Sequence, residues 1–138
     1  HDKEFASWSK GLIKDFRLRN YIPVLSKLTL DEISIAPKPV RETMKALLTY
    51  EAEILEITES ALELSEQYLS RKILTPKFRD DSLHIAIASL SMVDVLVSWN
   101  FKHIVHYDKI QLFNAVNLEN GVKPISIYTP REVTNYEE

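Results

Sequence analysis

The chain has 138 residues, of which 45% are hydrophobic and 27% are charged, and its formal net charge is -3 at pH 7. This length and composition are those of one globular domain with a core of its own. No apolar run approaches the ~20 residues of a membrane span, and the absence of cysteine excludes disulfides and thiolate metal sites while suiting a reducing cytosol. With only two glycines, the chain has no glycine-rich phosphate loop, which disfavours the Walker and Rossmann types of nucleotide-binding fold.

The first part of the chain predicts a helix, a strand and a second helix. Hydrophobic residues recur at helical spacing over residues 4–19, so this segment is expected to be an amphipathic helix. Residues 21–26 read as a short strand with a proline near its start, where proline is tolerated. Thr29–Glu32 has the T-x-x-E pattern of a capping box and predicts a short helix, which Pro37 and Pro39 end.

The middle of the chain predicts a helix over residues 40–49 and a second strand over residues 52–57. Thr58 has the chemistry of an N-cap and should open another helix. The residues of this helix that are expected to face inward are Ala61, Leu62, Ser65, Tyr68 and Leu69.

After this helix, the sequence predicts a helix that opens near Asp81 and a strand over residues 95–98. A helix over residues 108–117 should stop at Gly121 and be followed by a strand over residues 125–128. A last capping box is expected at Thr129–Glu132. Short apolar strands that alternate with helices predict an α/β fold whose parallel sheet is covered on both faces.

Ligands of such sheets bind beyond the carboxyl ends of the strands. The polar residues that follow strands, and so should share this edge, are Glu32, Thr58, Ser98 and Asn100. Asp81 shares the edge only if its helix begins there. Asp94 precedes its strand and therefore falls on the opposite edge.

Charge is unevenly spread along the chain. Residues 31–70 contain nine acidic and three basic residues. A basic cluster, defined as Arg71, Lys72, Lys77 and Arg79, then comes just before the pair Asp80-Asp81. Such a cluster is either a solvated loop or, beside a carboxylate site, a means of holding phosphates.

Four segments, DDSLHIAIA, DVLVSWNFKHI, FNAVN and TPREV, follow one another in the order seen in PIN-domain nucleases, and the chain resembles the toxin-like branch of toxin–antitoxin pairs. The similarity covers nearly the whole chain, including SKLTLDEI at residues 26–33, and its specific part is residues 81–103. The resemblance implies a single three-layer α/β/α PIN-like domain over residues 1–138 and a metal-dependent ribonuclease. It also implies an antitoxin partner and a homodimer.

The resemblance assigns site residues one by one. Glu32 matches the family's glutamate after the second strand, and Asp81 matches the aspartate that opens the helix before the fourth strand. Asn100 stands where many members have a further aspartate, although asparagine occurs in this branch. Ser98 matches the small hydroxyl residue just ahead of it.

The family also begins with a central strand that carries its first catalytic aspartate. The segment HDKEFASW resembles the turn and helix that follow that strand. Removing a central strand would cost far more than the ~5–15 kcal/mol that stabilises a domain. We therefore expect the native polypeptide to have residues upstream of His1.

Phosphodiester hydrolysis needs an activated water and compensation for the charge that builds on the phosphate. Mg²⁺ or Mn²⁺ supplies both and prefers hard oxygen ligands. We expect Asp81 and Glu32 to bind the ion directly or through water, with Asn100 offering its carbonyl oxygen or orienting a bound water. Lys77, Arg79, Lys102 and His103 are the expected contacts to the RNA.

The two carboxylates also have purely structural explanations. Glu32 fits equally well as the N3 member of the capping box that begins at Thr29. Asp80 or Asp81 can cap a helix and complement its dipole.

The same holds for other polar and aromatic residues of this region. His84 suits a core or groove better than a magnesium site, because imidazole ligation favours zinc. Lys102 and His103 can be ordinary surface groups, and Trp99 can stack on a base or pack under the sheet edge.

Three functions remain open from the sequence. The first is a toxin-type endoribonuclease with a metal-activated water. The second is a PIN-like domain with weak or no catalysis that binds RNA or a protein partner. The third is an unrelated α/β binding module whose carboxylates are helix caps. Only the nuclease should lose activity with EDTA or with Asp81→Asn while keeping its fold.

Overall fold

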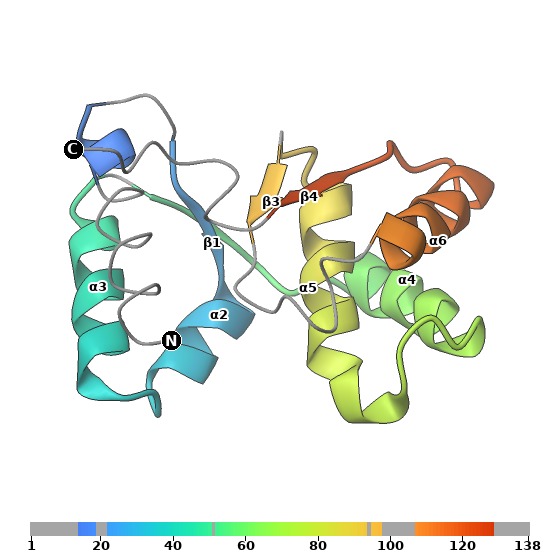
Figure 1. The fold of residues 1–138 in the computed structure, drawn as a ribbon, viewed down its shortest axis with the longest axis horizontal. Coiled ribbons are helices and arrows are strands. Elements are labelled where there is room, and N and C mark those ends of the chain that lie inside the picture. The colour runs from blue at the N-terminus through green and yellow to red at the C-terminus, as the bar shows by residue number, and fades with distance from the viewer. Residues whose placement is uncertain (1–13, 19–21, 51, 94, 98–106, 129–138) are drawn as a thin grey trace. The chain divides into compact units, whose positions relative to one another are not determined.

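In the computed structural model the described residues are 14–18, 22–50, 52–93, 95–97 and 107–128. The chain divides into two compact units (Figure 1). The first unit is His1–Leu55 with Pro130–Glu138, and the second is Glu56–Thr129. The prediction of a single domain is not tested by this division. Within the described part of the chain, no helix has the length and hydropathy that a membrane crossing requires.

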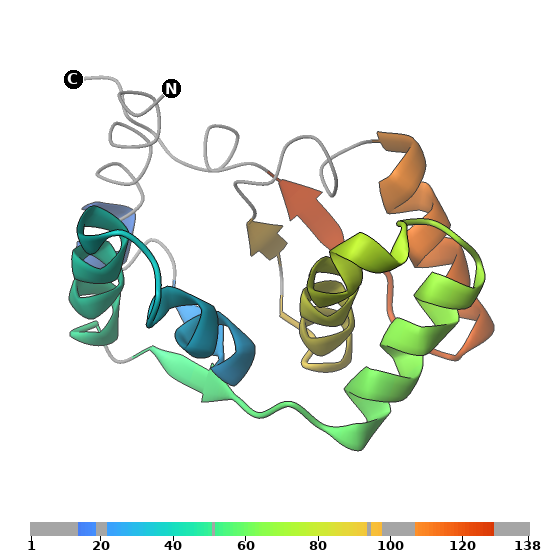
Figure 2. The ribbon, with the colours of Figure 1, turned by 90° about the horizontal axis from the view of Figure 1, so that it is seen from below.

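The first unit is built around one pair of parallel strands. Strand β1 (Val24–Ser26) leads into α2 (Lys27–Ile33) and α3 (Lys38–Leu48), and the chain then returns as β2 (Glu53–Leu55). The two strands pair in parallel, with Leu25 opposite Ile54. Figure 2 shows β2 as the green arrow that follows α3 along the chain. Residues 14–17 are helical, which agrees with the helix predicted for residues 4–19 over its described part.

The predicted capping box at Thr29 is wrong, because the N-cap of α2 lies three residues earlier. Ser26 is the N-cap, and its Oγ accepts a hydrogen bond from the Thr29 backbone N–H at 3.1 Å. Thr29 therefore occupies the N3 position, and its own hydroxyl lies 3.1 Å from the Ser26 hydroxyl. Glu32 falls in the last turn of the helix instead of its first.

Helix α3 also begins two residues before the prediction. Pro39 lies in its first turn, where the missing proline N–H leaves no helical hydrogen bond unmade. Proline thus starts this helix as well as separating it from α2.

The second unit contains helices α4 (Glu59–Ser70), α5 (Arg79–Leu90) and α6 (Tyr107–Glu119), strands β3 (Val95–Val97) and β4 (Ser126–Tyr128), and a short 3₁₀ turn η1 (Pro76–Phe78) before α5. Helix α4 packs along α5 and also contacts α6. Strands β3 and β4 pair in parallel, with Leu96 opposite Ile127. Thr58 is the N-cap of α4, as predicted, and its Oγ1 accepts from the Ala61 N–H at 3.1 Å.

The core of the second unit forms where its three helices meet. The Tyr68 and Phe113 rings are both fully buried and meet edge to face, with centroids 4.9 Å apart. The buried face of α4 consists of Ala61, Leu64, Ser65 and Tyr68. The prediction that Leu62 faces inward is wrong, since 48% of it is exposed, and Leu64 takes its place.

All three long helices of this unit end in a left-handed residue. Gly121 (φ +71°) follows α6, and the Gly121 and Val122 N–H groups donate to the carbonyls of Leu118 and Asn117 in a Schellman motif. The predicted stop at Gly121 is confirmed. Lys72 (φ 59°) and Met92 (φ 58°) hold the equivalent positions after α4 and α5.

The described fold is therefore mixed α/β with parallel strand pairing, as predicted. Its described strands form two separate two-stranded sheets, β1 with β2 and β3 with β4. The finer three-layer arrangement stays a prediction.

Candidate functional site

Asp81 lies in the first turn of α5 and is half-buried, whereas its neighbour Asp80 is exposed. The N-cap of α5 is Phe78, which makes no side-chain capping bond. The prediction that one of the aspartates caps the helix is wrong in that strict sense, because both carboxylates lie inside the first turn. There they still complement the positive end of the helix dipole.

Glu32 is exposed in the last turn of α2. The capping explanation for this residue fails, because Ser26 is the N-cap of α2 and Glu32 lies at the other end of the helix. A carboxylate in the last turn faces the negative end of the helix dipole, and no basic residue stands in that turn to offset it. Helix formation therefore gives no reason for glutamate at this position.

These two carboxylates belong to different units, Glu32 to the first and Asp81 to the second. Each is described within its own unit. Among the residues that the structure describes, no three His, Asp or Glu side chains are grouped closely enough to hold a metal ion. The other predicted site residues, Ser98, Asn100, Lys102 and His103, lie outside the described residues, as does Trp99.

The basic cluster is spread over the end of α4 and the start of α5, and two of its members pair with glutamates. Arg79 is the first residue of α5 and forms an ion pair with Glu66 of α4. Arg71 binds both carboxylate oxygens of Glu119, and the hydrogen bonding and charge of Glu119 raise the pKa of Arg71 above its ordinary value. Such exposed pairs contribute little to stability, so a phosphate could replace the carboxylate as partner at small cost.

Lys77 lies in η1, two residues before Arg79, and is exposed. Its Nζ sits 5.6 Å from the centroid of the Phe78 ring. Lys77, Arg79 and Asp81 thus stand within five consecutive residues, which span η1 and the first turn of α5. His84 follows on the same helix, half-buried.

Ser82 was missed by the sequence reasoning. It is fully buried beside Asp81 in α5, and its hydroxyl has no hydrogen-bond partner within the described part of the chain. Buried hydroxyls are nearly always paired, which marks this turn of α5 as unusual. The sequence signal was the serine directly after the aspartate pair.

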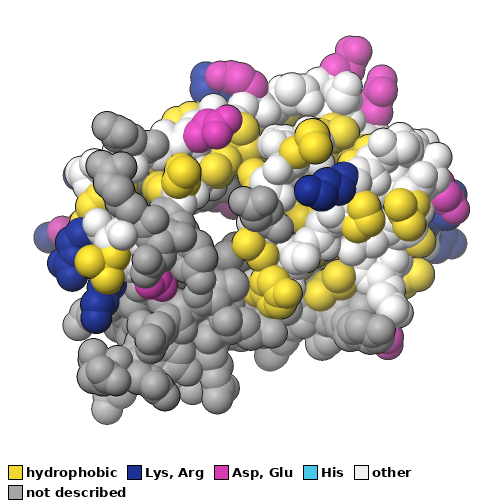
Figure 3. Space-filling model, turned by 90° about the horizontal axis from the view of Figure 1, so that it is seen from above, with side chains coloured by type: hydrophobic (Ala, Val, Ile, Leu, Met, Phe, Trp, Pro, Cys, Tyr) yellow, Lys and Arg dark blue, Asp and Glu magenta, His cyan; other side chains and the backbone are white. Residues whose placement is uncertain are grey.

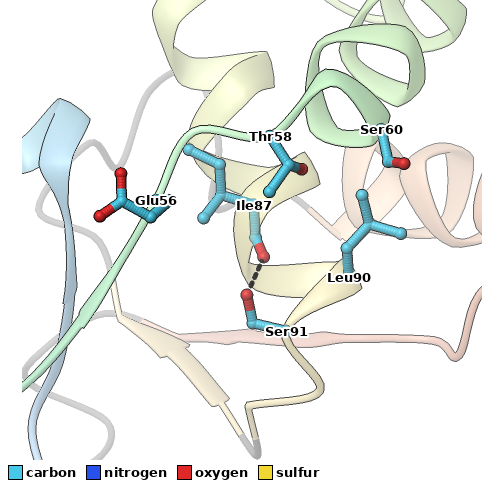
Figure 4. A pocket seen from close by; sticks show the side chains of 6 residues that line it. All are labelled: Glu56, Thr58, Ser60, Ile87, Leu90 and Ser91. Atoms are coloured by element: carbon cyan, nitrogen blue, oxygen red, sulfur yellow. Dashed lines mark hydrogen bonds between the residues drawn. The ribbon is translucent and has the colours of Figure 1, made fainter.

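A cavity of about 320 Å³ opens in the second unit between the start of α4 and the end of α5 (Figure 4). Its lining residues are Glu56, Thr58, Ser60, Ile87, Leu90 and Ser91. Figure 4 shows the Ser91 hydroxyl donating back to the Ile87 carbonyl at 2.7 Å, so that group is engaged within its own helix. Thr58 is likewise engaged as the N-cap, and no predicted metal ligand lines this cavity.

The FNAVN segment forms a buried polar network. The Asn117 side chain accepts from the Tyr68 hydroxyl and donates to Ser89 Oγ at 3.0 Å. Asn114 holds the backbone of Ile125, accepting from its N–H at 2.7 Å and donating to its carbonyl at 2.9 Å. Burial raises the pKa of Tyr68 to about 12. This segment therefore joins α4, α5, α6 and the start of β4, and its two asparagines have structural roles.

Comparisons of the chain with protein-family models, with curated proteins and with solved structures return no match. The PIN-domain resemblance therefore rests on the residues themselves.

Proposed function

We propose that this chain is a metal-dependent endoribonuclease of the toxin-like PIN type. The observation that carries the proposal is the half-buried Asp81 in the first turn of α5. It stands beside Arg79 and Lys77, cations suited to RNA phosphates. A carboxylate next to cations at one helix start matches the donor chemistry of a magnesium-assisted phosphodiesterase.

Strand pairing adds support from the backbone. The resemblance places the family's first strand in the centre of the sheet. The parallel pairing of β1 with β2 and of β3 with β4 agrees with the parallel strands of such a sheet.

The donor set fits Mg²⁺ or Mn²⁺, because Asp81 and Glu32 offer carboxylate oxygens and Asn100 an amide oxygen. When bound, the ion would supply an activated water and neutralise charge on the phosphate. Asp81 would hold the ion, since its carboxylate is already partly withdrawn from solvent. Glu32 and Asn100 would complete the ligands, with Ser98 supporting Asn100.

Arg79 would exchange Glu66 for a phosphate of the RNA, while Lys77, Lys102 and His103 would hold neighbouring phosphates. The same resemblance supplies the proposed partners, a cognate antitoxin covering the site and a second copy of the chain.

The test is RNA cleavage by the purified protein. Structured and single-stranded RNAs are compared with Mn²⁺, Mg²⁺ and EDTA. Asp81→Asn should lower the metal-dependent rate by at least about 100-fold, because it removes a ligand of the ion. Asp80→Asn is the matched control, since it removes the same charge from the same helical turn, and it should retain the parent rate.

Equal cleavage rates for the parent and Asp81→Asn would show that Asp81 is not part of the site. No cutting by a folded, metal-loaded protein that still binds RNA would favour the second function, a PIN-like binding domain. If metal ions and RNA show no coupling at all, the unrelated α/β module would be the better description.

A further inference from the structure

Helix α6 ends in Asn120-Gly121, and no other asparagine of the sequence is followed by glycine. An asparagine followed by glycine is chemically labile, because the glycine nitrogen can attack the side-chain amide without hindrance from a β-carbon. At Gly121 the surroundings add no hindrance either, since a Cβ placed there would meet nothing within 4 Å. Both residues are exposed, so water reaches them.

The reaction is a deamidation. The backbone nitrogen of Gly121 loses its proton and forms a bond to Cγ of Asn120, and the bond from Cγ to Nδ2 breaks. The departing nitrogen leaves as ammonia, and a succinimide ring remains. Water then opens the ring at either carbonyl, which yields aspartate or isoaspartate without any oxidant or reductant.

The folded helix end holds both reacting groups in hydrogen bonds. The Gly121 N–H donates to the Leu118 carbonyl at 3.2 Å, which opposes loss of the proton that the attack requires. The Nδ2 of Asn120 donates to the Val116 carbonyl at 2.8 Å, which keeps the side chain on the preceding turn of α6. Ring closure therefore needs the Schellman motif to open first.

We propose that Asn120 is a deamidation site gated by the closed end of α6. Local opening of this end releases the Gly121 N–H and the Asn120 side chain from their hydrogen bonds, and the rate of modification follows the population of the open form.

The aspartate or isoaspartate formed at residue 120 would also prevent the C-terminal end of α6 from closing again. A carboxylate at residue 120 adds charge beside Glu119 at the negative end of the helix dipole. Isoaspartate additionally lengthens the backbone by one carbon, which displaces Val122 from the 2.7 Å bond between its N–H and the Asn117 carbonyl. Asn117 is the residue whose side chain holds Tyr68 and Ser89, so damage at the exposed end reaches the buried network.

The test follows the full chain over time at mildly alkaline pH, in native buffer and in urea, with peptide mapping by mass spectrometry. Asn120 should deamidate at least about tenfold more slowly in the folded chain than in urea, because only the open form reacts. Asn114 and Asn117 are internal controls in the same helix, followed by alanine and leucine, and should remain intact. Asn120→Gln should give no product at this position, because its longer side chain closes a less favourable ring.

Amide exchange of Gly121 provides a second readout, since it reports opening of the same end. Conditions that speed exchange of this N–H should speed deamidation in proportion. Equal deamidation rates in the folded and unfolded chain would show that the closed end of α6 does not protect Asn120. An Asn120 that stays unmodified in urea would show that it is not a deamidation site. Deamidation that does not follow Gly121 exchange would also overturn the proposal.

Discussion

The two units differ in which of their described residues are buried. Aliphatic and aromatic side chains that are described as buried lie in the second unit, among them Tyr68, Ile85 and Phe113. In the described part of the first unit, the buried residues are Asp15, Pro23 and Ser26. The pattern of hydrophobic residues predicted helices and strands in both units equally well. A regular hydrophobic pattern therefore predicts that a helix or strand forms, but it does not show which other residues will bury the apolar side of that helix or strand.

Both units also have exposed hydrophobic residues. In the first unit, Ile22 and Ile35 are 78% and 87% exposed. The second unit also exposes apolar side chains, such as Leu112 and Leu118 of α6, but it does so around a filled core. Figure 3 shows one face of the molecule, on which hydrophobic side chains reach the surface among polar ones.

Phe113→Ala should have the largest effect, because it empties the centre of the second unit. We expect it to lower the free energy of unfolding by about 3–5 kcal/mol. Ile35→Ala, at an exposed position in the first unit, should change it by less than about 0.5 kcal/mol. Denaturant unfolding followed by circular dichroism checks both, and equal losses would contradict the comparison.

High pH should weaken the second unit through Tyr68. Its folded pKa of about 12 lies above the ordinary value of 10.0, because burial disfavours the phenolate. The unfolded chain therefore releases this proton first. The contribution is fully present below pH 10 and is lost as the pH rises to 12, by up to about 3 kcal/mol. Tyr68→Phe should abolish this part of the pH dependence, and unfolding measured between pH 9 and pH 12 checks it. An unchanged slope in the variant would exclude Tyr68 as its source.

The helix N-caps allow the same change to be made in both units. Ser26→Ala in the first unit and Thr58→Ala in the second should each cost about 1 kcal/mol, since each removes the acceptor for one helix N–H. Hydrogen exchange should rise at Thr29 in the first variant and at Ala61 in the second. If Ser26→Ala leaves Thr29 protected, the assignment of the α2 cap is wrong.

The smallest expected effect is a gain in stability at the end of α4. Lys72→Gly should raise the free energy of unfolding by about 0.5–1 kcal/mol, because glycine adopts φ 59° without strain. Gly121→Ala is the opposite control and should destabilise by about 1 kcal/mol, as it places a β-carbon at φ +71°. Thermal unfolding checks both signs, and a loss of stability in Lys72→Gly would show that the lysine side chain contributes more than its backbone strain costs.

Local signals in the sequence predicted much of this fold. Thr58 and Gly121 mark helix ends through chemistry that acts within a few residues, and both were assigned correctly. The start of α2 was misplaced because Ser26 and Thr29 are both good capping residues, three positions apart, and only the fold selects between them. Lysine at the left-handed end of α4 could not be predicted, since side chains other than glycine rarely adopt that conformation.

Interactions between distant segments were harder to predict. Asn117 meets Tyr68, which lies 49 positions away in the sequence, so no spacing rule suggests their hydrogen bond. The candidate site has the same difficulty, because Glu32 and Asp81 come from different units and only the family resemblance joins them. The structure contributes the local setting of each carboxylate, with Glu32 in the last turn of α2 and Asp81 in the first turn of α5.

Mn²⁺ binding by the purified protein is the most direct test of the central claim, that Asp81 is a metal ligand. The parent, Asp81→Asn and Asp80→Asn would be titrated while electron paramagnetic resonance follows the free ion. Loss of a ligand should weaken Mn²⁺ binding by at least about tenfold in Asp81→Asn, with Asp80→Asn binding as the parent does. Equal affinity in the parent and Asp81→Asn would contradict the account.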